Sequence, residues 1–247
     1  MKKLLSIYGA CDIGCVKPNN EDMILLGDEI FRDSSRRFIF DSDKRLVVAV
    51  ADGVGGLDKG EVASEIALTR LRELVNGLPA GMGNNEIEEA FNAYTRKTHS
   101  EIGEKGGSTL AGLLLYEGKM FRFHAGDSRI YLLRDGGLRR LTIDHSLCES
   151  GGDPSAPSNI ITNSLGGGSS AFIEFAEIND PLLHKDIYLL TSDGLHDLVP
   201  PDVIDDTLKL PEAELDEALP EILLRLAKEA GGKDNISVIT VKVANAA

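Results

Sequence analysis

The sequence predicts an α+β fold with mainly antiparallel sheet, because strand-like and helix-like segments occur in separate blocks along the chain. The densest block covers residues 108–142, where tight turns such as Glu117-Gly118 and Asp135-Gly136-Gly137 separate short apolar runs. Such spacing is typical of a β-meander. Two amphipathic segments precede this block, and one helix and one strand end the chain. Strict alternation of strands and helices would instead have favoured a parallel sheet.

Each element is expected from its own periodicity. Apolar residues at helical spacing predict helices at 61–75, 86–102 and 215–230. Short apolar runs bounded by turn residues predict strands at 23–27, 46–51, 108–116, 120–125, 129–134, 138–142, 172–178, 186–191 and 236–243. We find no internal repeat and no low-complexity linker, so we expect residues 1–247 to form a single domain.

Two segments stand apart from these elements. Residues 28–45 carry charges of both signs and are expected to form a solvated hairpin between two strands rather than a docking segment. Residues 148–170 are rich in Gly, Ser, Pro and Asn, which predicts a flap-like surface loop.

Composition excludes several classes of protein. The 247 residues include 26 Lys and Arg against 40 Asp and Glu, a net charge of −14, which is unsuited to binding a phosphate backbone. No apolar run approaches the roughly 20 residues of a membrane span, and the apolar stretch after Lys3 is too short for a signal peptide. The three cysteines form no CxxC pair, which favours free thiols. We therefore expect a cytoplasmic protein without nucleic-acid or membrane partners.

Familiar catalytic motifs are absent. The Gly106-Gly107-Ser108-Thr109 segment lacks the lysine of a P-loop, and the chain contains neither GxSxG nor HExxH. A cysteine phosphatase needs an arginine six residues after its nucleophile. The positions six residues after the cysteines are Lys17, Glu21 and Pro154. We therefore do not expect the mechanism of a cysteine phosphatase.

Acidic residues recur at the ends of apolar runs, often beside glycine: Glu21, Asp22, Asp52, Asp127, Asp193, Asp197 and Asp234. Any one of them alone is ordinary turn chemistry. Carboxylates that converge on one site repel each other unless a cation neutralises them. Oxygen ligands without Cys or His partners favour a hard ion, Mg²⁺ or Mn²⁺.

These segments also resemble a known family. The residues that carry the resemblance, in chain order, are Gly14-Cys15-Val16-Lys17-Pro18-Asn19-Asn20-Glu21-Asp22, Val50-Ala51-Asp52-Gly53-Val54-Gly55-Gly56, Gly107-Ser108-Thr109, Ala125-Gly126-Asp127-Ser128-Arg129, Leu141-Thr142-Ile143-Asp144-His145-Ser146, Leu190-Thr191-Ser192-Asp193-Gly194-Leu195 and Lys233-Asp234-Asn235-Ile236. They resemble the ordered motifs of the metal-dependent (type 2C, PPM) protein serine/threonine phosphatases of the bacterial single-domain type. The resemblance extends from about Gly9 to Val243.

The resemblance implies a four-layer α-β-β-α sandwich, in which two mainly antiparallel sheets pack face to face with helices on both outer faces. It also implies a centre of two Mn²⁺ or Mg²⁺ ions at one edge. Asp52 would bridge the two ions and Gly53 would contribute its carbonyl. Glu21 would help to hold one ion, and Asp193 and Asp234 the other.

Further residues follow from the same motifs. Asp22 would contact a cation through a water molecule, and Asp127 and Asp197, with Asp193, match a third, weaker metal site. The implied reaction is hydrolysis of phosphothreonine or phosphoserine in protein substrates, by a water activated between the two ions. Asp52, Asp193 and Lys17 are the expected catalytic residues.

Two positions depart from the family pattern. Lys17 stands where the family usually has a phosphate-binding arginine, so it offers a point charge without bidentate geometry. Arg36, Arg37 or Arg129 could assist it. The histidine often found in the glycine-rich motif is absent, with Val54 and Leu57 in that neighbourhood.

Other functions stay open at this point. The departures motivate a catalytically weak module of the same fold that binds phosphoproteins, and metal-dependent turnover distinguishes it from an enzyme. A stress regulator that acts on an anti-sigma antagonist is a weaker alternative, because such proteins usually carry sensor domains. Signal transduction opposite a cognate bacterial Ser/Thr kinase, such as one controlling a secretion apparatus, suits the layout better.

Overall fold

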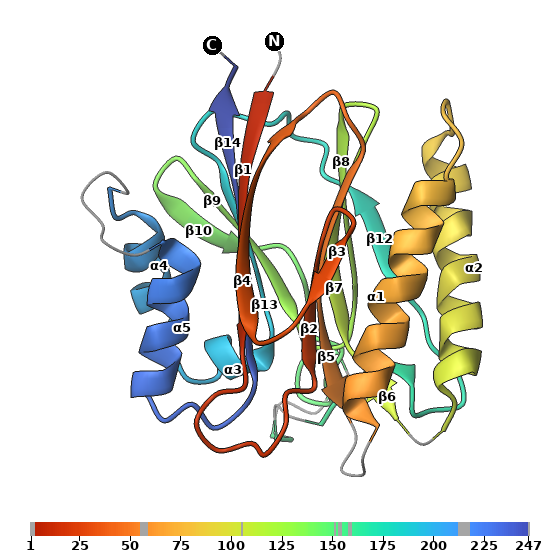
Figure 1. Cartoon of the computed structure of the whole chain (residues 1–247). Helices are drawn as coiled ribbons and strands as arrows, with labels where there is room; N and C mark the ends of the chain where they lie inside the picture. The colour runs from red at the N-terminus through yellow and green to blue at the C-terminus, as the bar shows by residue number, and fades with distance from the viewer. Residues whose placement is uncertain are drawn as a thin grey trace.

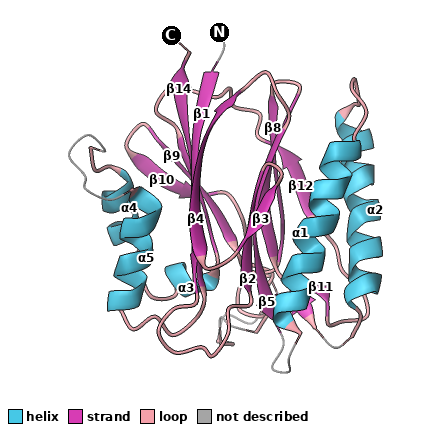
Figure 2. Cartoon of the chain, in the orientation of Figure 1, coloured by secondary structure: helices cyan, strands magenta, loops and turns pink. Residues whose placement is uncertain are grey.

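The computed structural model describes residues 3–54, 59–104, 106–150, 152, 155–157, 160–211 and 218–246. Two antiparallel sheets pack face to face, and helices cover both outer faces (Figures 1 and 2). The expected α-β-β-α sandwich is confirmed. Its strands are buried on both faces, which explains why many of them are continuous apolar runs rather than alternating ones.

One sheet has six strands in the order β10-β9-β13-β14-β1-β4. Its strands are β1 (Lys3–Asp12), β4 (Ser34–Asp41), β9 (Arg129–Arg134), β10 (Gly137–Arg140), β13 (Ile187–Thr191) and β14 (Ile236–Asn245). The longest pairing joins the two ends of the chain, since β1 lies antiparallel to β14 from Lys3 opposite Asn245 to Asp12 opposite Ile236.

The other sheet contains eight strands around β5, which pairs with β2, β6 and β7. Its strands are β2 (Asp22–Leu26), β3 (Glu29–Phe31), β5 (Leu46–Val54), β6 (Gly107–Ser108), β7 (Leu110–Tyr116), β8 (Lys119–Ala125), β11 (Leu165–Gly166) and β12 (Glu174–Glu177). The β7–β8 hairpin of the expected meander continues this sheet, whereas β9 crosses to the six-stranded sheet.

The described helices divide between the two outer faces: α1 (Gly60–Gly77) and α2 (Asn84–Ile102) on one, and α3 (Asp193–His196), α4 (Pro201–Leu208) and α5 (Leu219–Glu229) on the other (Figure 1). Leu68 and Leu71 of α1 and Phe91 of α2 pack on the eight-stranded sheet. Leu223 of α5 belongs to the cluster on the six-stranded sheet. None of the described helices is both long and apolar enough to traverse a lipid bilayer.

Because side chains alternate along a strand, successive residues face either the central core between the two sheets or the outer cluster beneath the helices. In β2 and β5, Ile24, Leu26, Val48 and Val50 point between the sheets, while their neighbours face α1 and α2. The same period places Tyr188 and Leu190 of β13 in the central core. At one end of the sandwich, the inward-facing positions of these strands extend beyond the apolar core. Polar residues occupy those positions and face each other between the sheets.

Two expectations are corrected near the N-terminus. Lys3–Asp12 was not expected to be a strand, yet it lies between β14 and β4, because Leu5, Ile7 and Cys11 alternate into the central core. The prediction of a solvated hairpin at residues 28–45 is also wrong. β3 pairs with β2, and β4 forms an edge of the six-stranded sheet with Phe38 and Phe40 packed against the core.

The C-terminal half departs less from expectation. Helix α4 was not expected, and the described part of the expected helix at 215–230 begins at Leu219; residues 215–217 lie outside the described residues. Within the expected loop at 148–170, β11 pairs with β6 and Ser146 bridges to Ile161. Residues 151, 153, 154, 158 and 159 of that loop also lie outside the description.

Candidate metal centre

Acidic side chains meet at the end of the sandwich opposite the two chain termini, where β2 and β14 begin and β5 and β13 end (Figure 1). Asp22 continues the inward row of Ile24 in β2, and Asp52 continues the inward row of Val50 in β5. Ser192 extends the inward row of Leu190 in the opposite sheet. Strand periodicity therefore directs these polar side chains between the two sheets.

Asp22 is completely buried. Ser192 Oγ donates a hydrogen bond to its Oδ2 at 2.7 Å, and Ser192 Oγ in turn accepts the backbone N–H of Ser237 at 2.9 Å. Its other oxygen, Oδ1, has no hydrogen-bond partner among the described residues. Burial, with the nearby charges of Asp193 and Asp234, raises the pKa of Asp22 to about 7.

Asp52 has the most strongly perturbed carboxyl of the centre. Burial raises its pKa well above the ordinary value, and the negative charges of Asp22, Asp193 and Asp127 raise it further. Thr109 fixes the backbone here, since its N–H donates to the Asp52 carbonyl at 2.8 Å and its Oγ1 accepts the Asp52 N–H at 3.1 Å. The strand end cannot easily move to relieve this repulsion.

Asp193 begins the short helix α3, directly after β13. Its Oδ1 is buried without a hydrogen-bond partner within the described part of the chain, and burial together with Asp234 and Asp197 raises its pKa to about 6. The next residue must be glycine, because a Cβ on Gly194 would lie 1.9 Å from the carbonyl oxygen of Asn235. This close approach brings Asp193 toward the start of β14.

Asn235 holds this end of the molecule together. Its Oδ1 accepts the backbone N–H of Glu21 at 2.8 Å, and its Nδ2 donates to the carbonyls of Ile13 and Asn19 at 2.9 and 3.0 Å. The adjacent Asp234 pairs with Lys17, whose Nζ lies 2.8 Å from Asp234 Oδ1. Lys17 therefore lies at the acidic centre, as expected.

Glu21 and Gly53 come together at the start of α1. The Gly53 N–H donates to the Glu21 carbonyl at 3.2 Å, and Ser64 Oγ donates to the same carbonyl at 2.6 Å. A Cβ on Gly53 would lie 2.2 Å from the Gly60 carbonyl oxygen, so only glycine fits. Burial raises the pKa of Glu21. Gly55 and Gly56 of the same motif lie outside the described residues.

Asp127 lies in the turn between β8 and β9 and is 6% exposed. Its Oδ1 is another buried oxygen for which the described residues supply no partner, and burial with the charge of Asp193 raises its pKa to about 7. Asp197 is exposed, and its pKa is raised by partial desolvation and by Asp144 and Asp234, against the opposing charge of Arg129. Asp127 and Asp197 thus lie within electrostatic range of Asp193.

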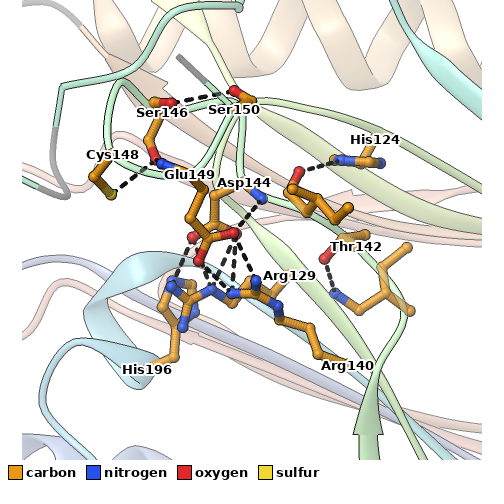
Figure 3. A network of polar contacts seen from close by, with 12 residues as sticks. His124, Arg129, Arg140, Thr142, Asp144, Ser146, Cys148, Glu149, Ser150 and His196 are labelled. Carbon is orange, nitrogen blue, oxygen red and sulfur yellow. Dashed lines mark hydrogen bonds and ion pairs between the residues drawn. The ribbon is translucent and has the colours of Figure 1, made fainter. Parts of the chain in front are cut away.

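Two of the three arginines suggested as helpers of Lys17, Arg129 and Arg36, contact other residues. Arg129 forms a forked ion pair with Asp144, with its Nε at 3.0 Å and its Nη2 at 2.6 Å from Oδ2 (Figure 3). Arg36 contacts Glu29 and the ring of Phe31. Arg37 lies beside Arg36 on β4. Arg129 and Arg36 are therefore held by other groups, and Arg37 lies opposite Tyr8 of β1.

The residues present fit divalent cations. Asp22, Asp127 and Asp193 each keep a buried oxygen without a partner in the described ranges, and their pKa values are all raised. Buried carboxylates without partners are costly, and a hard cation with oxygen ligands removes that cost. Mg²⁺ and Mn²⁺ suit this donor set because it offers neither thiolate nor imidazole.

The sequence pattern indicates the acids but assigns no role to the residues that orient them: Thr109, Ser192, Asn235 and Ser237. The inward position of Ser192 could have been predicted from the sequence, because this polar residue continues the inward row of β13. Asn235 offered none, because its partners lie more than 200 residues away in the sequence.

Comparison with known proteins agrees with this geometry. The sequence profile of the family described as protein phosphatase 2C matches residues 28–209. The chain belongs to the protein phosphatase 2C family. The serine/threonine phosphatase stp of Listeria welshimeri is 32% identical over 219 residues, which cover 81% of this chain and 85% of that protein. Within this protein phosphatase 2C chain, the acidic segments described above converge at one end of the sandwich (Figure 1).

A second relative is the serine/threonine protein phosphatase PstP of Mycobacterium tuberculosis, 30% identical over 245 residues. The match covers 94% of this chain and 44% of PstP, so the chain spans less than half the length of that protein. The catalytic domain of PstP, solved in complex with two manganese ions, superimposes with a TM-score of 0.73 at 29% identity. That match covers 98% of this chain and all of that domain.

Proposed function

We propose that this chain is a Mn²⁺- or Mg²⁺-dependent phosphatase that hydrolyses phosphothreonine and phosphoserine in protein substrates. The observation that carries the proposal is a set of three carboxylates on a protein phosphatase 2C fold, each with a buried oxygen that has no partner among the described residues: Asp22, Asp127 and Asp193. Relatives named as serine/threonine phosphatases support the substrate class, and the manganese complex of PstP supports the metal. The acids are retained together, which favours an enzyme over a module that only binds phosphoproteins.

The following residues would hold the cations. Asp52 would bridge two ions and Gly53 would add its carbonyl, with Glu21 on one ion and Asp193 and Asp234 on the other. Asp22 would act through water, since Ser192 already occupies one of its oxygens. Asp127 and Asp197, with Asp193, would form a third, weaker site.

Two bound cations would supply an activated water for in-line attack on phosphorus and would neutralise the phosphoryl oxygens. The protein would hold the carboxylate ligands in position and would bind the substrate phosphate. Lys17 is held at the edge of the acidic centre by Asp234, and its pKa is raised by the charges of Asp234, Asp52 and Glu21 against the effect of burial. It therefore stays protonated and binds a phosphate oxygen as a point charge.

The cellular setting follows from the same chemistry. We propose that the substrates are products of a cognate Ser/Thr kinase and that the protein acts in signal transduction in the cytoplasm, with residues 1–247 as one catalytic domain. The net charge of −14 supports proteins rather than nucleic acids as partners.

Hydrolysis of a phosphothreonine peptide tests the proposal. Chelator-treated protein is titrated with Mn²⁺ and with Mg²⁺, beside the Asp193→Asn variant. We expect turnover that requires metal and is lost in the variant. Absence of turnover from folded, metal-loaded protein would favour the phosphoprotein-binding module instead.

A further inference from the structure

His124, His145 and Glu174 form a polar cluster at the side of the acidic centre. The two imidazole rings stack with their centroids 4.5 Å apart. His145 Nε2 lies 3.4 Å from Glu174 Oε1, and His124 Nδ1 lies 3.9 Å from Glu174 Oε2. Both histidines are buried, and the three donor groups lie within 4.8 Å of one another. By composition, this cluster matches a zinc site.

The protonation of His145 argues against a metal here. The backbone N–H of Gly126 donates to His145 Nδ1 at 3.2 Å, and a backbone N–H can only donate. Nδ1 therefore carries the lone pair, and the ring proton of the neutral imidazole is on Nε2, facing Glu174. Burial lowers the pKa of His145, which favours this neutral form. A protonated Nε2 cannot coordinate a cation, so the cluster has another role.

Asn163 donates to the same nitrogen. Its Oδ1 accepts the backbone N–H of Phe172 at 3.1 Å, which fixes the orientation of the amide. Its Nδ2 then donates to His145 Nδ1 at 2.8 Å and to the Phe172 carbonyl at 2.9 Å. One lone pair of His145 thus receives hydrogen bonds from two different segments of the chain, the turn at Gly126 and the segment 160–172.

The turn at Gly126 presents Asp127. Besides accepting the Gly126 N–H, His145 donates its own backbone N–H to the Gly126 carbonyl at 3.0 Å, so both polar groups of Gly126 are bound to one residue. Gly126 has a φ of +101°, and a Cβ there would lie 2.8 Å from Thr109. The conformation of the turn, and hence the place of the Asp127 carboxylate, depends on this clamp.

Other contacts fasten the same two segments together. The His145 carbonyl accepts the Thr162 N–H at 2.7 Å, and Ser146 bridges to Ile161. On the other side of the turn, Arg129 is held by Asp144, the neighbour of His145 (Figure 3). The segment 144–146 therefore connects the segment 160–172 to the Asp127 turn.

We propose that His145 is a positioning residue: its Nδ1 lone pair holds the Gly126 turn so that Asp127 is presented to the acidic centre, and it couples that turn to the segment 160–172 through Asn163. The inference rests on the proposed function, because the cation that Asp127 would bind is the third, weaker one. Its direct prediction concerns the turn itself and the affinity of that cation.

The test distinguishes a role of the His145 Nδ1 lone pair from a role of the His145 ring in packing. His145→Phe keeps an aromatic ring to stack on His124 and removes both nitrogens, whereas His145→Asn removes the ring and keeps an acceptor near the position of Nδ1. Asn163→Asp is a second, isosteric variant, which removes the amide donor. His99→Phe is the matched control, because His99 Nδ1 also accepts a backbone N–H of the same loop, that of Gly166 at 2.9 Å.

The readouts are amide hydrogen exchange of Gly126 and Asp127 and the binding isotherm of Mn²⁺, followed by the EPR signal of free Mn²⁺. For His145→Phe and Asn163→Asp we expect faster exchange at the turn and about tenfold weaker binding of the weakest Mn²⁺, with the tight pair unchanged. His145→Asn should show exchange rates and Mn²⁺ affinity close to those of the wild type. The control His99→Phe should show the wild-type values.

A purely packing role predicts the opposite order, with His145→Phe close to wild type and His145→Asn impaired, and that order would overturn the proposal. If Asp127→Asn does not change weak Mn²⁺ binding, the third site is wrong, while the exchange data still decide whether His145 holds the turn. If the wild type binds Mn²⁺ but hydrolyses no phosphopeptide, the proposed function fails and the positioning role does not.

Discussion

Asp22 and Asp52 lie directly opposite each other across the antiparallel β2–β5 pair, with both carboxylates on the inward side of the sheet. Like charges at such a pair are destabilising, and here burial strengthens the repulsion. Ser192, at the end of β13 in the opposite sheet, donates a hydrogen bond to one of these carboxylates, that of Asp22. The fold therefore keeps a repulsive pair at this end of the sandwich, where cations of the proposed centre would remove the repulsion.

The first prediction concerns the ligands of that centre. Asp52→Asn and Asp193→Asn should each lower kcat for a phosphothreonine peptide by at least about a hundredfold, because several kcal/mol of charge stabilisation are lost. Without metal, both variants should be as stable as wild type or more stable, because each removes a repelling charge. Peptide assays and thermal melts in chelator measure both effects. Asp135→Asn, at an exposed turn, is the control, and near-normal activity of either ligand variant would disprove the assignment.

The second prediction concerns pH in the absence of metal. The pKa values of Asp22 and Asp127 are raised to about 7 and that of Asp193 to about 6, against about 4 in an unfolded chain. The native state therefore binds protons more tightly than the unfolded state, and the free energy of unfolding should fall as the pH rises from about 4 to about 7.

Thermal melts of chelated protein between pH 4.5 and 8 measure this loss of stability. Saturating Mn²⁺ should abolish most of it, because the ionised carboxylates then have a partner. Equal slopes with and without Mn²⁺ would show that these acids do not bind the metal.

The third prediction concerns Lys17. Lys17→Ala should raise KM, lower kcat, or both, because the ammonium of the proposed site would contact phosphate in the ground and transition states alike. Lys17→Arg should keep or improve activity, since a guanidinium can bind phosphate with two hydrogen bonds. Steady-state kinetics on one phosphopeptide measure the series, with Lys44→Ala at an exposed turn as the control. Unchanged constants for Lys17→Ala would remove Lys17 from the site.

The fourth prediction concerns the side-chain amide of Asn235, which connects the start of β14 to residues 13–21. Asn235→Ala leaves the Glu21 N–H and the carbonyls of Ile13 and Asn19 without this partner. We expect it to lower the free energy of unfolding by about 2–4 kcal/mol and to weaken Mn²⁺ binding. Urea unfolding and Mn²⁺ titration check both. Asn76→Ala, which loses one exposed hydrogen bond to Asp28, should change neither.

The fifth prediction concerns close packing behind the site. Gly194→Ala places a Cβ 1.9 Å from the Asn235 carbonyl oxygen and should destabilise the protein by at least about 3 kcal/mol. Gly77→Ala meets no atom within 4 Å at the end of α1 and should be neutral or stabilising. Chemical denaturation of the two variants provides the comparison, and equal stability of both would contradict the packing described here.

The sequence by itself determined the fold class, most of the strands and the acids of the candidate centre. These features depend on local information: residue period, turn residues and short motifs such as Asp52-Gly53 and Asp193-Gly194. Local sequence information was therefore enough to name the acids that the structure brings together at one end of the sandwich.

Only the tertiary structure decided how those residues are held. It paired Ser192 with Asp22 across 170 positions of sequence, engaged Arg129 with Asp144, and made Lys3–Asp12 and Ser34–Asp41 neighbouring strands. A local pattern cannot specify such partners, because they are selected by the packing of one sheet against the other. The sequence therefore indicates the candidate ligands, and the packing of the sandwich determines which of their buried oxygens lack a partner among the described residues.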